Sequence, residues 1–366
     1  MHNNYTVGFF VQTPFHYYLY ETIIDELVKR NVHCHLVLND YLAYSNEWKD
    51  MHYGLVEFIE QLERTDIDAF LLSTIKEHEF VYDCFVSPFY TNEIRDLSKL
   101  HVRLMYGLAK ENWTYAWWNV FYDKIFCYGD YDYNKLNICN NCIKIGNPKF
   151  DRWFQNKLPS KHELIKADKL NIDSSKETIL YAPTYGNLSS IDRWLDKIKK
   201  LEENYNIIVK LHHGTVFLSS EKNRRQKIYT QFENICDDRV NILHLLKVSD
   251  YVLTDYSGII FDALLASKPV ILLNIEVNSN FTDSRSLEIK IRSQIEEVND
   301  EMELCDVLQN KKYEEQKYID INEYYFIDPN ENAGAKAADE IIKLLNHSDD
   351  ILDNKFLLSL REQLFK

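Results

Sequence analysis

Short apolar runs alternate with amphipathic stretches along most of this chain. In the first part, the apolar runs predict strands at residues 5–12, 33–39, 81–87, 102–106, 124–128 and 142–145. The stretch between the first two runs has apolar residues at helical spacing and predicts a helix over residues 17–30. Strands that alternate with helices are typical of a parallel sheet with helices on both faces. The pattern therefore predicts an α/β fold.

The same pattern starts afresh in the second part of the chain. Gly146, Asn147 and Pro148 break the first series. Apolar runs then predict strands at residues 178–182, 206–211, 240–243, 251–253 and 270–273. We expect two doubly wound, Rossmann-like domains, at residues 1–150 and 151–345. Such domains bind ligands beyond the carboxyl ends of their strands, and two of them facing a cleft suit a two-part substrate.

Residues 346–366 form a separate amphipathic segment. Its larger apolar side chains fall near one helical face, and they are Leu352, Phe356, Leu357, Leu360 and Leu364. We expect a C-terminal helix that packs back on the protein. The alternative is a helix that lies on a membrane surface.

Composition excludes several classes of function. The net charge of −15 argues against a nucleic-acid partner. The sequence has neither an apolar run long enough to cross a bilayer nor the pattern of a signal peptide at its N-terminus. Seven scattered cysteines predict reduced thiols and a cytoplasmic location. Cys139 and Cys142 form a lone CxxC, and no His or Glu cluster accompanies Asp130 and Asp132, so we expect neither a metal nor a cofactor.

Residues 248–274 carry the most informative pattern, a strand, a polar loop, a helix and a second strand. Such a unit points the N-terminus of the helix out of the carboxyl edge of the sheet. Ser257 and Gly258 in the loop would let a phosphate approach the backbone N–H groups. The alternative is an ordinary β–α–β unit in which Ser257 only caps the helix.

Two more loops follow predicted strands of the same domain. Thr184 offers a hydroxyl after the first strand, and His212 and His213 follow the second. Adjacent side chains of an extended chain point to opposite sides, so we expect only one of these histidines to reach a ligand. Its imidazole could donate to a phosphate oxygen and offset charge on a leaving group, whereas the alternative is a pair of solvated loop histidines. Because the loops share one sheet edge, they could hold a diphosphate without a metal.

Three motifs in this order resemble those of the CDP-glycerol glycerophosphotransferase family, which includes teichoic-acid primases and polymerases and some capsule polymerases. They are YAPTYG at residues 181–186, KLHHGT at 210–215 and SDYVLTDYSGIIFDALLASKP at 249–269. The segment GNPKFD at residues 146–151 resembles the family's G-x-P-R-x-D hinge, with Lys149 in place of Arg. The resemblance covers about residues 100–330. It implies the GT-B glycosyltransferase architecture.

The resemblance also implies the reaction. A glycerol phosphate or a related polyol phosphate would pass from a CDP-linked donor to a hydroxyl of a teichoic acid or capsule polymer. Residues 1–150 would hold the glycan or lipid-linked acceptor, and residues 151–345 would hold the donor. Such an acceptor implies peripheral contact with the inner face of the cell membrane.

The donor-binding residues that the resemblance implies lie in the three loops. The pyrophosphate would lie near His212, Thr254, Ser257 and Gly258, with Asp255 beside it to orient the loop. Thr184 and His213 complete the candidate donor site. His212 is also a candidate catalytic residue, because it would offset charge as CMP leaves.

One position departs from the family pattern. The family's expected general base is a His in a His-Gly-Thr-Pro segment, and Tyr106 occupies that place here. A phenol with an unperturbed pKa of about 10 is a poor base near neutral pH. His16, which follows the first predicted strand, is the candidate catalytic base, and it could equally cap the helix that begins there. His101 starts a strand and lies at the wrong end of the sheet.

The sequence also allows two other functions. Thr13, Pro14 and Phe15 resemble the start of bacterial GT-B sialyltransferases, so the chain could be a glycosyltransferase that uses CMP-sialic acid or a UDP-sugar. Tyr106 in place of His could instead mark a non-catalytic partner that binds a nucleotide or a polymer.

Overall fold

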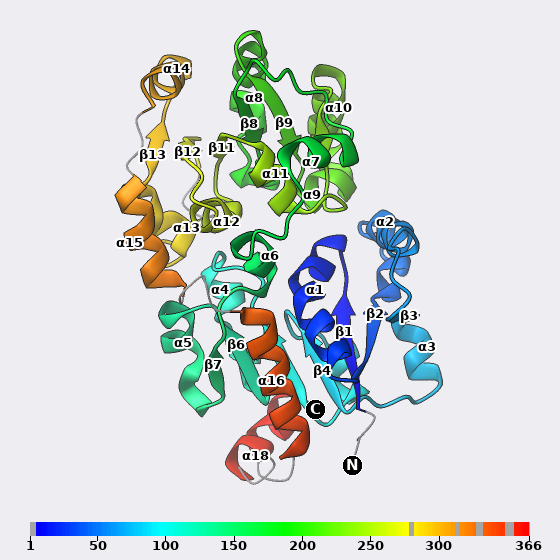
Figure 1. The fold of residues 1–366 in the computed structure, drawn as a ribbon. Coiled ribbons are helices and arrows are strands. Elements are labelled where there is room, and N and C mark those ends of the chain that lie inside the picture. The colour runs from blue at the N-terminus through cyan, green and yellow to red at the C-terminus, as the bar shows by residue number, and fades with distance from the viewer. Residues whose placement is uncertain (1–4, 278–281, 312–314, 327–331, 348–354, 366) are drawn as a thin grey trace. The chain divides into compact units, whose positions relative to one another are not determined.

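The chain folds into two compact α/β units, which Figure 1 shows for this computed structural model. The structure describes residues 5–277, 282–311, 315–326, 332–347 and 355–365. The first unit comprises Met1–Tyr106, Tyr115–Asn156 and Glu323–Lys366, and the second comprises Gly107–Thr114 and Lys157–Asn322. The sequence-based division differs in three places, because residues 107–114 group with the second unit, whereas residues 151–156 and 323–345 group with the first.

The first unit is built on a seven-stranded parallel sheet with the strand order β3-β2-β1-β4-β5-β6-β7. The strands are β1 (Thr6–Val11), β2 (His33–Leu38), β3 (Asp68–Leu71), β4 (Cys84–Ser87), β5 (His101–Leu104), β6 (Lys124–Cys127) and β7 (Cys142–Lys144). The α-helices of this unit are α1 (Pro14–Lys29), α2 (Lys49–Glu60), α3 (Leu72–Glu77), α5 (Asp130–Leu136), α6 (Asp151–Phe154), α16 (Ala333–Asn346) and α18 (Lys355–Leu364). The apolar faces of α1, α2 and α16 contribute to a core of aliphatic and aromatic side chains.

The second unit has a six-stranded parallel sheet with the order β10-β9-β8-β11-β12-β13. Its strands are β8 (Thr178–Tyr181), β9 (Asn206–Lys210), β10 (Ile235–Cys236), β11 (Tyr251–Thr254), β12 (Val270–Leu273) and β13 (Glu296–Val298). The α-helices are α4 (Glu111–Thr114), α7 (Lys161–Ala167), α8 (Ile191–Lys200), α9 (His213–Phe217), α10 (Lys222–Gln231), α11 (Ile242–Val248), α12 (Ile259–Leu265), α13 (Leu287–Lys290) and α14 (Glu301–Asn310). Helix α15 (Glu315–Tyr325) contributes residues to both units.

The strand expected at residues 240–243 is wrong. Asn241 accepts a hydrogen bond from the Leu243 N–H and starts α11, whose buried residues recur at helical spacing. The strand that pairs with the outer side of β9 is the shorter β10, which precedes α11 in the sequence. Two edge strands, β3 and β13, were not expected. Strand β3 has four residues and is largely exposed, and β13 has three residues, two of which are glutamates.

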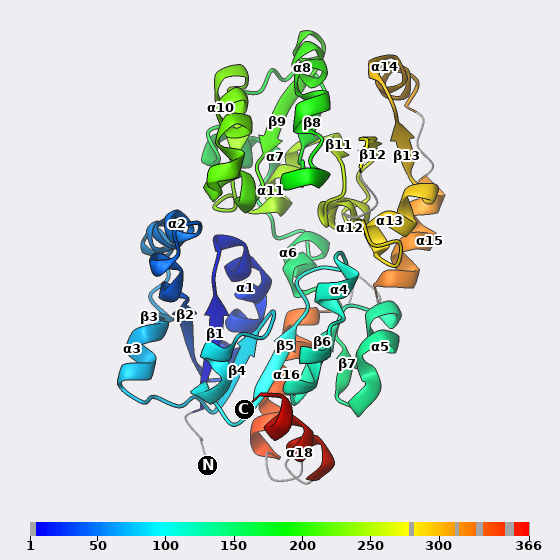
Figure 2. The same ribbon diagram turned by 180° about the vertical axis from the view of Figure 1, so that it is seen from behind.

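Helix α16 belongs to the first unit because it packs beside α1, as both views show (Figures 1 and 2). Ala337, Ala338 and Ile341 are fully buried in the core of that unit. The Asp151 carboxylate holds the start of the helix. Its Oδ1 accepts from the Ala333 N–H at 3.0 Å, and its Oδ2 accepts from the Gly334 N–H at 2.7 Å. Asp151, the last residue of the GNPKFD segment, therefore fixes the returning C-terminal chain.

Asp151 is expected to make stability fall as the pH rises through the mildly acidic range. Burial raises its pKa to about 6, although the two N–H donors partly oppose this. The folded protein therefore holds the proton more tightly than the unfolded chain, and the resulting stability is complete below pH ~4 and lost as the pH rises through ~6. The loss should reach about 3 kcal/mol.

Urea denaturation of the wild type and of Asp151→Asn between pH 4 and 7 measures this contribution. The stability difference between the two proteins should shrink as the pH rises, because only the wild type has this carboxyl. A difference that is constant with pH would show that the pKa of Asp151 is not raised.

The C-terminal helix α18 packs on the first unit. The Arg361 guanidinium donates to the carbonyls of Val120 and Tyr122, each at 2.7 Å, and pairs with Asp123. Phe365 is buried and stacks on Trp117. The expectation that this helix packs back on the protein is confirmed for the described residues. Leu352 and the rest of residues 348–354 lie outside them.

Candidate functional site

Three loops meet at the carboxyl edge of the second sheet. They follow β8, β9 and β11, which are neighbours because β8 pairs with both of the others. All three strands run parallel, so their carboxyl ends lie at the same edge. The structure therefore brings Thr184, His212 and Ser257 to one edge, as the motif spacing predicts.

Asp255 joins the loop after β11 to the loop after β8. Its Oδ1 accepts from the Thr184 N–H at 2.9 Å, and its Oδ2 accepts from the Ser190 N–H at 2.7 Å. The carboxyl is fully buried, and this burial raises its pKa although the N–H donors oppose the change. The Thr254 hydroxyl, also fully buried, donates to the Ala182 carbonyl at 2.7 Å. Contact between a ligand and either side chain would require these bonds to break.

Arg292 contacts the buried side of the loop that follows β11. Its Nη1 donates to the Asp255 carbonyl at 3.0 Å, and its guanidinium lies 4.2 Å from the centre of the Tyr256 ring. Glu297 pairs with this guanidinium at 2.9 Å. Ser257 and Gly258 follow and are partly exposed, and α12 begins next. The loop is thus held on its buried side, while the part that carries Ser257 and Gly258 is accessible.

His212 is held in one orientation. Its Nδ1 accepts from the Gly214 N–H at 3.0 Å, so the proton of the neutral ring resides on Nε2. The Tyr185 ring stacks on the imidazole with centroids 4.6 Å apart. Gly214 is required here, because a Cβ at this position would lie 2.5 Å from the Tyr185 ring. Burial, followed by the charge of His213, lowers the pKa of His212 well below its usual value. His212 is therefore a neutral donor through Nε2–H.

His213 has a different environment. Its Nδ1 lies 3.3 Å from Asp238 Oδ2, and the Lys210 ammonium lies 2.5 Å from Asp238 Oδ1. Burial opposes ionisation of Asp238, but Lys210 and His213 outweigh it and hold the pKa of this carboxyl well below its usual value. The expectation that the two histidines point apart is wrong. Their rings lie 4.0 Å from each other, because His213 is already the first residue of α9 and not part of a strand.

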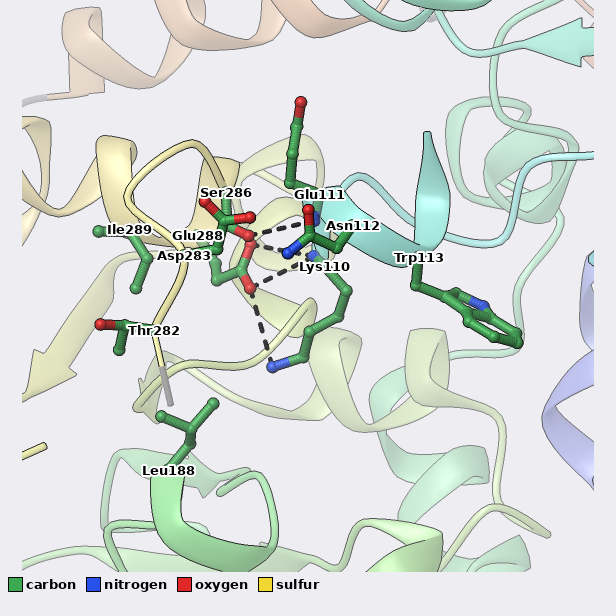
Figure 3. A pocket seen from close by; sticks show the side chains of 10 residues that line it. All are labelled: Lys110, Glu111, Asn112, Trp113, Leu188, Thr282, Asp283, Ser286, Glu288 and Ile289. Atoms are coloured by element: carbon green, nitrogen blue, oxygen red, sulfur yellow. Dashed lines mark hydrogen bonds and ion pairs between the residues drawn. The ribbon is translucent and has the colours of Figure 1, made fainter. Parts of the chain in front are cut away.

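A pocket of about 200 Å³ lies in the same unit, and none of the candidate donor residues lines it (Figure 3). Residues 110–113 line one side, and side chains from residues 282–289 and Leu188 line the other. The Glu288 carboxylate is buried and accepts from the Lys110 backbone N–H. Neither Lys110 nor Glu288 was among the site residues predicted from the sequence. Lys110 lies four positions after Tyr106 in the segment compared with the family's base motif, whereas no local pattern marks Glu288.

A family model described as CDP-Glycerol:Poly(glycerophosphate) glycerophosphotransferase matches residues 104–343. This range covers more than half of the chain and includes all three loops. The chain belongs to this family. The prediction made from the three sequence motifs is confirmed.

Curated relatives of this glycerophosphotransferase-family chain are teichoic-acid enzymes. The chain is 30% identical over 140 residues to the teichoic acid poly(glycerol phosphate) polymerase of Bacillus spizizenii, a match that covers 35% of this chain and 34% of that one. It is 21% identical over 196 residues to the teichoic acid glycerol-phosphate transferase of Staphylococcus aureus, covering 50% and 49%. The matches thus span between about a third and a half of the length of these relatives.

Solved structures share the fold. The wall teichoic acid polymerase TagF matches with a TM-score of 0.64 and 16% identity, covering 95% of this chain and 89% of that one. The UDP-GlcNAc 2-epimerase of Neisseria meningitidis bound to UDP-GlcNAc matches with a TM-score of 0.59 and 16% identity, covering 93% and 99%. These likenesses confirm the predicted α/β class of GT-B type, with one Rossmann-like sheet in each unit.

The family's usual base position falls in the first unit. Tyr106 lies just after β5, is partly exposed and packs against the core of that unit. His101, the third candidate, is buried, and its Nε2 lies 2.9 Å from the Ser98 carbonyl. Burial lowers the pKa of His101 to about 4.

His16 lies in the first turn of α1 and is almost fully buried. Its Nδ1 accepts from the Gln12 N–H at 3.1 Å, and its ring packs against Phe89. In this tautomer the proton resides on Nε2, so a base role requires the proton to move and the bond from Gln12 to be released. The bond from Gln12 lies ahead of the helix, whose N-cap is Thr13 and which has no side-chain cap hydrogen bond. The base role stays a prediction.

Two negative findings concern the described residues alone. In the described ranges, His, Cys, Asp and Glu side chains form no group of three or more that could hold a metal ion. The helices in the same ranges include none with both the length and the apolar composition needed to cross a bilayer.

Proposed function

We propose that this chain transfers a polyol phosphate, with glycerol phosphate as the first candidate, from a CDP-linked donor to a hydroxyl group of a teichoic acid or related cell-surface polymer. The observation that carries the proposal is the family match over residues 104–343, which contains the three loops at the sheet edge. The names of the curated relatives support both the polyol phosphate and the polymer.

In the proposed reaction, the acceptor oxygen attacks the β-phosphorus of the donor in line with the bridging oxygen. A new P–O bond forms, the bond to the bridging oxygen breaks, and CMP leaves with the electron pair. The acceptor's proton goes to a general base. Charge develops on the oxygens of the transferred phosphoryl group and of CMP, so donors fixed in advance are the main source of rate acceleration.

The residues of the second unit receive separate roles in this proposal. His212 donates through Nε2–H to a phosphate oxygen, because its Nδ1 is occupied by the Gly214 N–H. Ser257 and Gly258 offer a hydroxyl and a backbone N–H on the accessible part of their loop. Thr254 and Asp255 act as positioning residues, since their side chains are bonded inside the unit. His213 and Thr184 support their loops, through Asp238 and Asp255 respectively.

Phosphorus NMR of the product tests the reaction. The protein is incubated with CDP-glycerol and a teichoic-acid primer that carries a free terminal hydroxyl. The proposal predicts CMP and a new phosphodiester signal on the primer. Transfer from a UDP-sugar or CMP-sialic acid with no phosphodiester signal would contradict it and favour a glycosyltransferase.

The same proposal places the reaction in the cytoplasm, at the inner face of the cell membrane, where a lipid-linked polymer would be elongated. Cell fractionation tests this location. Recovery of the protein outside the cytoplasmic and inner-membrane fractions would contradict it.

His16 is the proposed general base, and its replacement is expected to reduce turnover about a hundredfold with little change in donor affinity. His16→Ala removes both ring nitrogens. His16→Asn is the matched variant, because its Oδ1 can still accept from the Gln12 N–H while the Nε2 position is lost. Turnover and CDP binding are measured for both. If His16→Asn keeps full turnover, His16 only holds the Gln12 backbone and the base assignment is wrong.

A further inference from the structure

Residues 107–114, a loop followed by the short helix α4, belong to the second unit, although the residues on both sides belong to the first. The Lys110 N–H donates to the Glu288 carboxylate, with its nitrogen 3.1 and 3.3 Å from the two oxygens. The Glu111 N–H donates to the Ser286 hydroxyl at 3.1 Å. The Arg285 guanidinium donates to the side chain of Asn112. These bonds fix the place from which the Lys110 side chain leaves the loop.

Lys110 also has an uncommon backbone conformation. Its φ of 64° lies in the left-handed region, which costs free energy for any residue with a Cβ. The paired N–H bond to buried Glu288 offsets this cost. The loop therefore fixes the backbone of Lys110 and the direction in which its side chain begins.

The Lys110 ammonium lies beside the loop that carries Ser257 and Gly258. Its Nζ is 3.5 Å from the Tyr256 carbonyl oxygen and 3.7 Å from Glu288 Oε1, as Figure 3 shows for the second contact. A Cβ built on Gly258 would lie 3.7 Å from the Ala109 side chain. Both ammonium distances exceed that of a close hydrogen bond. With 43% of its side chain exposed, Lys110 can turn its N–H donors toward a ligand.

The electrostatics of the site point to the kind of ligand. The chain has a net charge of −15, so a diphosphate needs a local cation. His212 does not supply one, because burial, His213 and nearby lysines including Lys110 lower its pKa. The Arg292 guanidinium is buried and paired with Glu297. Lys210 is paired with Asp238, whereas the Lys110 ammonium lies 3.5 Å from the Tyr256 carbonyl oxygen and is partly exposed.

We propose that Lys110 binds the diphosphate of the donor directly, and that Glu288 serves as its counterion until the donor arrives. This inference rests on the proposed function and adds to it a binding residue for the same site. On donor binding, the ammonium exchanges its distant contact with Glu288 for charge-assisted hydrogen bonds to phosphate oxygens. Glu288 still holds the Lys110 backbone, so the loop stays in place.

Calorimetric titration of the full chain with CDP and with cytidine tests the inference. Lys110→Met keeps the length of the side chain and removes the charge. The control is Lys200→Met in the same unit, because Lys200 pairs with Glu301 on the surface and its side chain is 63% exposed. Lys110→Met should bind CDP about tenfold to a hundredfold more weakly than wild type and bind cytidine unchanged. Lys200→Met should bind both ligands as the wild type does.

The alternative is that Lys110 only forms a salt bridge. In that case Lys110→Met would bind CDP with wild-type affinity, and the inference is overturned. If the wild type itself binds neither CDP nor CDP-glycerol, the proposed function fails as well, so the two failures are distinguishable.

A second measurement needs no variant and covers the case in which Lys110→Met does not fold. Acetylation of lysines in the wild type is followed by peptide mass spectrometry with CDP, with cytidine and without ligand. CDP should slow acetylation of Lys110 at least severalfold more than cytidine does, and should leave Lys200 unaffected. Equal labelling of Lys110 under all three conditions would contradict direct contact with the diphosphate.

Discussion

Replacing His212 by asparagine is expected to preserve the fold and to reduce turnover with a CDP-linked donor about a hundredfold. The asparagine Oδ1 can take the place of imidazole Nδ1 and accept from the Gly214 N–H, which the structure shows at 3.0 Å. No atom then replaces Nε2–H. The loss therefore measures the hydrogen bond to the donor and not the support of the loop.

Glutamine is the complementary variant. Its side-chain amide can reach the Nε2 position and donate, but it no longer accepts from Gly214. We expect His212→Gln to melt at a lower temperature than His212→Asn and yet to turn over more donor. The reverse order of activities would show that His212 only caps α9. Thermal unfolding and CMP release, measured on the same preparations, separate the two roles.

Replacing Asp255 by alanine is expected to have the largest effect on stability, a loss of about 3 kcal/mol in the free energy of unfolding. The substitution leaves the N–H groups of Thr184 and Ser190 buried without their acceptors. It also frees the loop after β8 from the loop after β11, so donor binding should weaken together with stability.

Asp192→Ala is the matched control. Asp192 lies in the same unit, on α8, and its side chain is 58% exposed where it pairs with Arg224. Loss of such a surface pair should cost less than about 1 kcal/mol. Urea denaturation at neutral pH measures both variants. An Asp255→Ala protein within 1 kcal/mol of Asp192→Ala would contradict the role that we give to the buried carboxyl.

Much of the fold could be predicted from the sequence, because buried parallel strands are continuous apolar runs. The runs at residues 178–182, 251–253 and 270–273 correspond to β8, β11 and β12. Edge strands carry weaker patterns, which is why the short strands β3 and β13 were missed. The run that includes Ile242 was misread as a strand, because a short apolar segment fits a strand and a helix equally well.

The motifs locate the site, but they do not show which residues would contact the donor and which only hold the loops in place. Motif spacing brought Thr254, Asp255 and Ser257 to the right sheet edge, but it does not say which side chains face inward. Thr254 and Asp255 are fully buried, whereas Ser257 is partly exposed. Lys110 and Glu288 are separated by 178 positions, and such a contact depends on the tertiary fold. The packing of α16 on the first unit also depends on a long-range contact, because Asp151 and Gly334 are 183 positions apart.

The most direct test of the proposed donor is the binding of CDP compounds. The melting temperature of the protein is measured with CDP, CDP-glycerol, CDP-ribitol, CMP-sialic acid, UDP and UDP-GlcNAc. Ligand at about a hundredfold over its Kd should stabilise the protein by about 2.7 kcal/mol, a readily measured shift. We expect stabilisation by CDP and by a CDP-polyol and none by the UDP compounds. Stabilisation by UDP-GlcNAc or CMP-sialic acid alone, or by none of the six ligands, would contradict it.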